Sequence, residues 1–420
     1  MSPEPPAPNA HRSMTTELCR LPPPAARRPP YERPSMFDDV DIRALSQRPG
    51  VKWRRAAADV LPAWIAEMDF PPAPPIREAL LRCVDEDLGY PAWDSGPDGM
   101  PLRTAFAERM LGRHGFAVDP AHVKEFADIN QAVQAVLSVA TEPGDSVAVH
   151  TPTYPPFLQT LAEMGRRVLP VPYTADADSW TFDPERLDTE LARSTCPVLI
   201  LVNPHNPTGR ALRREELTVL AELAERHDLL VVADEIHADL VHAPHRHIPF
   251  GSIGPEAAAR TVTLTSATKA FNVPGVRCAV AHLGPRRVRE ALSRPSRLYG
   301  EPNTFGVAAT LAAWQQGDAW LDGLRRALAE NIAVLRKELP PGVEFRAPDA
   351  TFLAWLDCRP LGLDRDPGPF FLEEARVLLN DGSAFGPAGE GFVRLNFGTS
   401  AANLREILRR MTGAVADVGR

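Results

Sequence analysis

Short apolar runs alternate with longer stretches of helical spacing between about residue 123 and residue 305. The runs that we predict as strands are Val123–Ile129, Ser146–Val149, Arg167–Val171, Val198–Val202, Leu229–Ala233, Thr261–Leu264 and Val276–His282. The predicted helices between them are Gln131–Thr141, Tyr154–Met164 and Arg214–Arg226. Strands that are apolar throughout and alternate with helices indicate an α/β fold, in which helices cover both faces of a mostly parallel sheet.

After Phe305 the pattern changes to two long helical stretches, two shorter strands and a final helix. These elements are expected at 306–317, 319–339, Thr351–Leu356, Phe392–Phe397 and Ala402–Met411. They predict a second, smaller α/β domain. We therefore expect four parts: an extension over 1–35, an N-terminal segment over 36–75 that packs on the small domain, a large domain over 76–305 and a small C-terminal domain over 306–420.

The composition is that of a soluble globular protein, with 44% hydrophobic and 24% charged residues in a chain of 420. The net charge of −8 argues against a nucleic-acid-binding surface. No apolar run approaches the roughly 18 residues that span a bilayer. The five cysteines are scattered and odd in number, which favours reduced thiols and a cytoplasmic location.

The first 35 residues differ from the rest, because they are rich in proline and poor in aliphatic side chains. Such a segment cannot bury enough apolar surface to fold alone, and it lacks the apolar core of a secretory signal. We expect a disordered extension.

Polar groups follow three of the predicted strands. Asn206 comes after Val198–Val202, Asp234 after Leu229–Ala233, and Lys269 after Thr261–Leu264. Open α/β sheets bind their ligands at the carboxyl ends of the strands. An amide, a carboxylate and an amine at one sheet edge therefore predict a binding site.

Lys269 stands among small, apolar and hydroxyl residues. It is either a strand-end lysine that reaches water or a desolvated amine that forms a Schiff base with a carbonyl cofactor. If the cofactor is pyridoxal phosphate (PLP), Asp234 suits its protonated ring nitrogen, although an Asp here can also cap a helix. Asn206 suits the phenolic oxygen, although an Asn–Pro turn is the simpler alternative.

A phosphate group needs positive and hydrogen-bonding partners. Ser266 offers a hydroxyl and Arg277 a bidentate grip. The predicted helix start near Ile129 and Asn130 offers free backbone N–H groups. Tyr154 either stacks on the cofactor ring or packs in the core.

Arg394 lies in an alternating strand of the small domain, where it either faces solvent or binds the α-carboxylate of an amino acid. A candidate metal site is suggested by four histidines that lie close together in sequence, His237, His242, His245 and His247. These histidines lack the usual ligand spacing and a cysteine, so we expect no metal. The glycine-rich dinucleotide and Walker phosphate motifs are absent from the sequence.

Together these clusters resemble fold-type I PLP-dependent enzymes, in the class I/II aminotransferase family, over about residues 37–415. The motifs that carry the resemblance are NPHNPTGR (203–210), ADEIH (233–237) and SATKAFNVPGVR (266–277). The resemblance implies a Schiff-base lysine at Lys269 and a substrate-carboxylate arginine at Arg394. It implies cofactor contacts from Asp234, Asn206, Tyr154, His237, Ser266, Arg277, Ile129 and Asn130. The stretch Ala127–Asn130 departs from the family's phosphate loop, which leaves the side-chain roles there open.

The stretches WIAEMDF (64–70) and EPNTFG (301–306) resemble the bacterial cystathionine β-lyase branch of this family, the MalY/PatB type. That branch implies a carbon–sulfur β-lyase acting on an L-cysteine S-conjugate such as cystathionine. An aminotransferase is the alternative, since both reactions use Lys269. A non-catalytic role on this scaffold is disfavoured by the retained lysine, aspartate and arginines. Tyr90 resembles the tyrosine that reaches the phosphate of the neighbouring subunit, which implies a homodimer.

Overall fold

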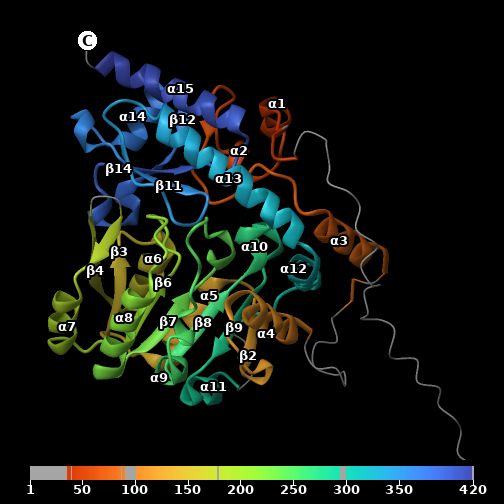
Figure 1. Cartoon of the computed structure of the whole chain (residues 1–420), viewed down its shortest axis with the longest axis vertical. Helices are drawn as coiled ribbons and strands as arrows, with labels where there is room; N and C mark the ends of the chain where they lie inside the picture. The colour runs from red at the N-terminus through yellow and green to blue at the C-terminus, as the bar shows by residue number, and fades with distance from the viewer. Residues whose placement is uncertain are drawn as a thin grey trace, which may run out of the picture. The chain divides into compact units, whose positions relative to one another are not determined.

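The computed structural model describes residues 36–38, 40–86, 88–89, 101–176, 179–293 and 299–418 (Figure 1). Residues 36–420 form one compact unit. The predicted extension over 1–35 lies outside the described residues. The division of the compact unit at residues 76 and 306 stays a prediction.

An eight-stranded sheet forms the centre of this unit, in the order β2-β9-β8-β7-β6-β3-β4-β5. The strands are β2 (Val123–Phe126), β3 (Ser146–Thr151), β4 (Arg167–Ala175), β5 (Trp180–Phe182), β6 (Val198–Val202), β7 (Leu230–Asp234), β8 (Thr261–Thr265) and β9 (Ala279–Leu283). The five strands from β8 to β4 are parallel, whereas β9 runs antiparallel to both of its neighbours and β5 antiparallel to β4. The mostly parallel sheet expected from the sequence is confirmed.

Helices cover both faces of the sheet. Side chains alternate between the faces along each strand, so a strand that is apolar throughout presents apolar side chains to both. Val198, Ile200 and Val202 pack with apolar residues of α5 (Ile129–Ala140), α6 (Pro155–Glu163) and α11 (Arg286–Leu292). Leu199 and Leu201 face the opposite way. They pack with α7 (Pro184–Ala192), α8 (Arg214–Arg226) and α9 (Pro255–Ala259). Every residue of β3, β6 and β7 is buried, which accounts for the apolar runs over 147–149, 198–202 and 230–233.

A four-stranded antiparallel sheet lies in the C-terminal part, in the order β10-β11-β14-β13. Its strands are β10 (Glu344–Phe345), β11 (Leu353–Asp357), β13 (Asn380–Asp381) and β14 (Phe392–Asn396), and the helices of this part are α13 (Asp318–Glu338), α14 (Pro367–Glu374) and α15 (Ala401–Val418). A short parallel pair of β1 (Leu61–Pro62) and β12 (Val377–Leu378) joins the N-terminal segment to it.

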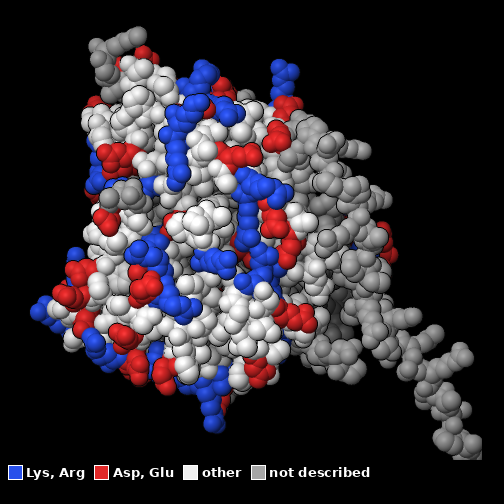
Figure 2. Space-filling view, viewed as in Figure 1, with Lys and Arg blue, Asp and Glu red and all other residues white. Residues whose placement is uncertain are grey.

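The remaining described helices are α1 (Ile42–Ser46), α2 (Val51–Arg54), α3 (Pro74–Glu86), α4 (Pro101–His114), α10 (Ala267–Ala270) and α12 (Thr304–Gln316). Helix α12 packs against α3 and α4. No described helix is long and apolar enough to cross a membrane. Basic and acidic side chains are interspersed on the face shown in Figure 2.

Two predicted strands overrun the observed ones by three residues. The strand expected over Val276–His282 begins only at Ala279, because Pro274–Val276 form a 3-10 turn and Arg277 adopts a positive φ of 50°. The strand expected over Val123–Ile129 ends at Phe126, because the Asp128 side chain caps the helix that starts at Ile129. In both places a capping or turn residue interrupts an apolar run.

Candidate active site

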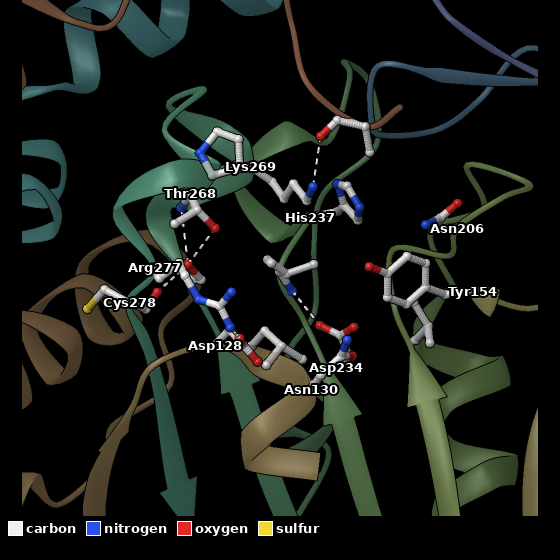
Figure 3. Close-up of a pocket in the computed structure, with 16 residues that line it drawn as sticks. Asp128, Asn130, Tyr154, Asn206, Asp234, His237, Thr268, Lys269, Arg277 and Cys278 are labelled. Carbon is white, nitrogen blue, oxygen red and sulfur yellow. Dashed lines mark hydrogen bonds and ion pairs between the residues drawn. The ribbon is translucent and has the colours of Figure 1, made fainter. Parts of the chain in front are cut away.

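A cavity of about 230 Å³ lies where β6, β7 and β8 end (Figure 3). Its lining residues are Ala66, Asp128, Ile129, Asn130, Tyr154, Val202, Asn206, Asp234, Ile236, His237, Ser266, Thr268, Lys269, Pro274, Arg277 and Cys278. Parallel strands direct their carboxyl ends to one edge, so groups far apart in sequence meet there. Of the predicted site residues that the structure describes, all line this cavity except Arg394.

Lys269 lies in α10, directly after β8. Its Nζ donates a 2.7 Å hydrogen bond to the backbone oxygen of Ala66. Burial, followed by the charge of Arg394, lowers the pKa of the Lys269 amine to about 8. About a tenth of this amine is therefore uncharged at pH 7, as a nucleophile or base must be.

Asp234 is the last residue of β7, and it is buried. Burial raises the pKa of its carboxyl to about 7, against the lowering effect of a 3.1 Å hydrogen bond from the Ile236 N–H. Among the described residues no cation pairs with this carboxylate at ion-pair distance. A ligand that brings a positive charge to Asp234 would remove this burial cost.

Arg394 lies on β14 and is buried beside the cavity. Its guanidinium donates to Asn206 Oδ1 at 3.0 Å and to the Trp64 backbone oxygen at 2.9 Å, while its Nε has no partner among the described residues. Burial lowers the pKa of Arg394 to about 10. This is a buried cation without a carboxylate partner in the part of the chain that the structure describes, and it is suited to an anionic ligand.

Asn206 is oriented by this contact. Because Arg394 donates to the amide oxygen of Asn206, the NH₂ group of that amide is left to donate elsewhere. Figure 3 shows Asn206 and Tyr154 on the same side of the cavity. The Asn–Pro turn and the cavity role of Asn206 are thus compatible.

Tyr154 and His237 both line the cavity. Tyr154 also makes an edge contact with Phe157, with ring centroids 5.3 Å apart, so it belongs to both the core and the site. His237 is buried, and burial lowers its pKa to about 3. Its ring is therefore neutral at neutral pH, and its Nδ1 has no partner among the described residues.

The predicted phosphate-binding side chains make internal contacts in this structure. The Ser266 hydroxyl donates to the Cys278 backbone oxygen at 2.5 Å and accepts from the Thr268 N–H at 3.1 Å. The Arg277 guanidinium pairs with the Asp128 carboxylate. Ser266 lines the cavity together with these groups, and Figure 3 shows Arg277 beside Asp128, which caps α5.

The segment Trp64–Phe70 crosses the site, which the sequence did not reveal. Two of its carbonyls serve predicted site residues, since Trp64 accepts from Arg394 and Ala66 from Lys269. Two more, those of Ile65 and Glu67, each accept from Asn396 at 2.6 Å. The sequence showed this segment only as a motif of the resembled branch. Backbone carbonyls leave no trace in the residue pattern, so no local signal identified it.

A buried ion pair joins this segment to α2. Lys52 Nζ lies 2.9 Å from Asp69 Oδ1, and the two side chains are 1% and 4% exposed. Lys52 also donates to the Glu67 oxygen at 3.1 Å, and Trp53 Nε1 donates to Asp69 at 2.9 Å. These contacts hold Glu67 and Asp69, which lie in the same segment as the carbonyls that meet Lys269 and Arg394.

Tyr90 lies outside the described residues. The histidines weighed as metal ligands make separate contacts: His247 pairs with Glu235, His242 with the Thr351 oxygen, and His245 with Asp349. In the described part of the chain, no group of three or more His, Cys, Asp or Glu side chains is placed to hold a metal.

The chain is similar to known proteins over most of its length. The family model "Aminotransferase class I and II" matches residues 87–411. Cystathionine beta-lyase PatB of Bacillus subtilis is 36% identical and covers 90% of this chain and 100% of its own. The cystathionine beta-lyase of Corynebacterium glutamicum is 31% identical, and the match covers 89% of this chain and 99% of that enzyme. The crystal structure of cystalysin from Treponema denticola, which contains a pyridoxal 5'-phosphate cofactor, superposes with a TM-score of 0.84 at 26% identity, over 91% of this chain and 98% of that one.

Proposed function

The chain belongs to the family of class I and II aminotransferases, and from this we propose that it is a PLP-dependent carbon–sulfur β-lyase. The substrate class is an L-cysteine S-conjugate such as cystathionine, the substrate named for the relatives PatB and the Corynebacterium enzyme. One structural observation carries the proposal: Lys269 and Asp234 line one cavity and have pKa values displaced toward each other by burial. Such displaced values cluster at catalytic sites.

The residues of the cavity fit PLP. Lys269 would carry the cofactor, and the Asp234 carboxylate, whose burial is uncompensated, would hold its protonated ring nitrogen. The free NH₂ of Asn206 would donate to the phenolic oxygen, and Tyr154 would stack on the ring. The phosphate group would be held by Ser266, Arg277 and the backbone N–H groups of Ile129 and Asn130, with His237 beside the ring.

When bound, PLP supplies an electron sink that stabilises negative charge at the substrate α-carbon. Lys269 would take the α-proton as general base, since its pKa of about 8 leaves part of the amine uncharged. The negative charge of Asp234 would favour the protonated ring nitrogen. Loss of the α-proton and of the β-thiolate would give a thiol and 2-aminoacrylate, and water would hydrolyse the 2-aminoacrylate to pyruvate and ammonia.

Arg394 would bind the α-carboxylate of the substrate. It is buried, has no acidic partner in the described structure, and is already oriented by Asn206 and the Trp64 carbonyl. An arginine fork matches a carboxylate in a way that a lysine cannot.

The experiment that tests the function offers two substrates to the purified protein. Incubation with cystathionine should release a thiol and pyruvate, whereas alanine with a 2-oxo acid should exchange amino groups slowly or not at all. Lys269→Ala serves as the control and should do neither. Amino exchange without thiol release would establish the aminotransferase alternative, which the family also contains.

A cytoplasmic homodimer with shared sites completes the proposal, and it depends on Tyr90 and the family resemblance. Mixing a Lys269→Ala chain with a Tyr90→Phe chain, each inactive alone, should restore part of the activity, because one site of the heterodimer is then intact. A fully active monomer would contradict the shared site.

A further inference from the structure

One carboxylate joins two groups that the proposed function assigns to the phosphate of the cofactor. Asp128 Oδ1 accepts a 2.9 Å hydrogen bond from the Gln131 N–H, in the first turn of α5. Asp128 Oδ2 pairs with the guanidinium of Arg277. The Asp128 carboxylate thus lies where a helix N-terminus and an arginine converge, and it borders the cavity.

This arrangement places a negative charge at the anion-binding end of the cavity. A helix N-terminus and a guanidinium both attract anions. Here each already has an anionic partner within the chain. Ile129 and Asn130, at the first two positions of α5, have no acceptor for their backbone N–H groups among the described residues, and Ser266 donates internally to Cys278.

We propose that Asp128 is an internal anion that competes with the phosphate group of the cofactor for Arg277 and for the N-terminus of α5. The proposal rests on the proposed function, because it takes this cavity to be the cofactor site. In the cofactor-free chain Asp128 keeps Arg277 and the helix end paired. When the phosphate binds, it has to share these partners with the negative charge of Asp128 or displace it. The affinity for phosphate is therefore lower than Arg277 and the N–H groups of α5 would give without Asp128.

The alternative is that Asp128 orients Arg277 toward the phosphate. The two roles predict opposite changes when the charge alone is removed. Asp128→Asn keeps the shape and the helix-capping oxygen but removes the carboxylate charge. Asp128 is about one-third exposed, so the substitution should not prevent folding.

The test measures binding to the cofactor-free full-length chain. The dissociation constant of inorganic phosphate is determined by calorimetry, and those of PLP and pyridoxal by absorbance. For Asp128→Asn we expect both phosphate-bearing ligands to bind about tenfold more tightly, since a partly screened charge several ångströms away has about that effect. Pyridoxal, which lacks the phosphate, should bind equally to both proteins. The gain should shrink as salt rises, because exposed charges are screened.

Asp183→Asn is the matched control. Asp183 caps α7 through a 3.0 Å bond from the Arg186 N–H, and it does not line the cavity. This variant should bind phosphate and PLP as the wild type does. Weaker phosphate binding by Asp128→Asn would show that Asp128 orients Arg277 and would overturn the proposal, as would unchanged binding. A wild-type chain that binds no PLP would instead refute the proposed function itself.

Discussion

Replacing Arg394 by methionine should separate substrate binding from stability. Methionine has a similar length and fits an apolar environment, but it removes the charge and both hydrogen bonds of the guanidinium, to Asn206 and to the Trp64 oxygen. Loss of a charge-assisted pair with a substrate carboxylate at a desolvated site costs about 2–5 kcal/mol. We expect kcat/KM for cystathionine to fall roughly 30- to several-thousand-fold, since each 1.4 kcal/mol is about a factor of ten.

The stability of the same variant should change little. The two hydrogen bonds from a charged donor contribute about 1.5–3 kcal/mol each. Against this, the guanidinium is buried without a carboxylate partner in the described structure, and burying an ion costs several kcal/mol. These opposing contributions are similar in size, so the free energy of unfolding should stay within about 2 kcal/mol of the wild type.

Arg210→Met is the control for this argument. Arg210 is also buried, but it pairs with Glu216 at 2.5 Å and with Asp349 at 2.7 Å. Its loss leaves both carboxylates without their buried cation, although Arg213 stays beside Glu216 and His245 beside Asp349. It should cost about 3–5 kcal/mol in urea unfolding. Wild-type kinetics in Arg394→Met would place the substrate carboxylate elsewhere. A stability loss equal to that of Arg210→Met would refute the description of Arg394 as an unpaired cation.

Three further outcomes are expected. As pH rises from 8 to about 10.5, the cofactor-free protein should gain stability relative to Lys269→Met. In this range the amine of Lys269 keeps its proton in the unfolded chain but has lost it in the folded one. A difference in melting temperature that stays constant across this range would contradict the lowered pKa. Lys52→Met should destabilise the protein by about 3–5 kcal/mol in urea unfolding, because Asp69 is left buried without its cation. A loss below about 1 kcal/mol would show that this pair does not hold the 64–70 segment. A chain starting at Met36 should keep its fold and activity, and loss of either on truncation would assign a role to the proline-rich extension.

The sequence was sufficient for the sheet and for its carboxyl edge. The apolar run Val198–Val202 and the amphipathic stretch Arg214–Arg226 coincide with β6 and α8, because burial on both faces or on one face determines the periodicity directly. The meeting of Asn206, Asp234 and Lys269 also followed, since parallel strands present their carboxyl ends together. These features depend on local pattern and on a general rule of topology.

The partners of those groups were decided by the tertiary structure alone. Arg394 meets Asn206 across 188 residues, and Lys269 meets the Ala66 carbonyl across 203. The buried pair of Lys52 and Asp69 is likewise formed only when the N-terminal segment packs over the site. Periodicity records which side chains are buried, but it holds no information on which distant backbone carbonyl or carboxylate will satisfy them. That choice is made when the segments pack together, because each buried polar group must then find its partner among whatever the fold brings within hydrogen-bonding distance.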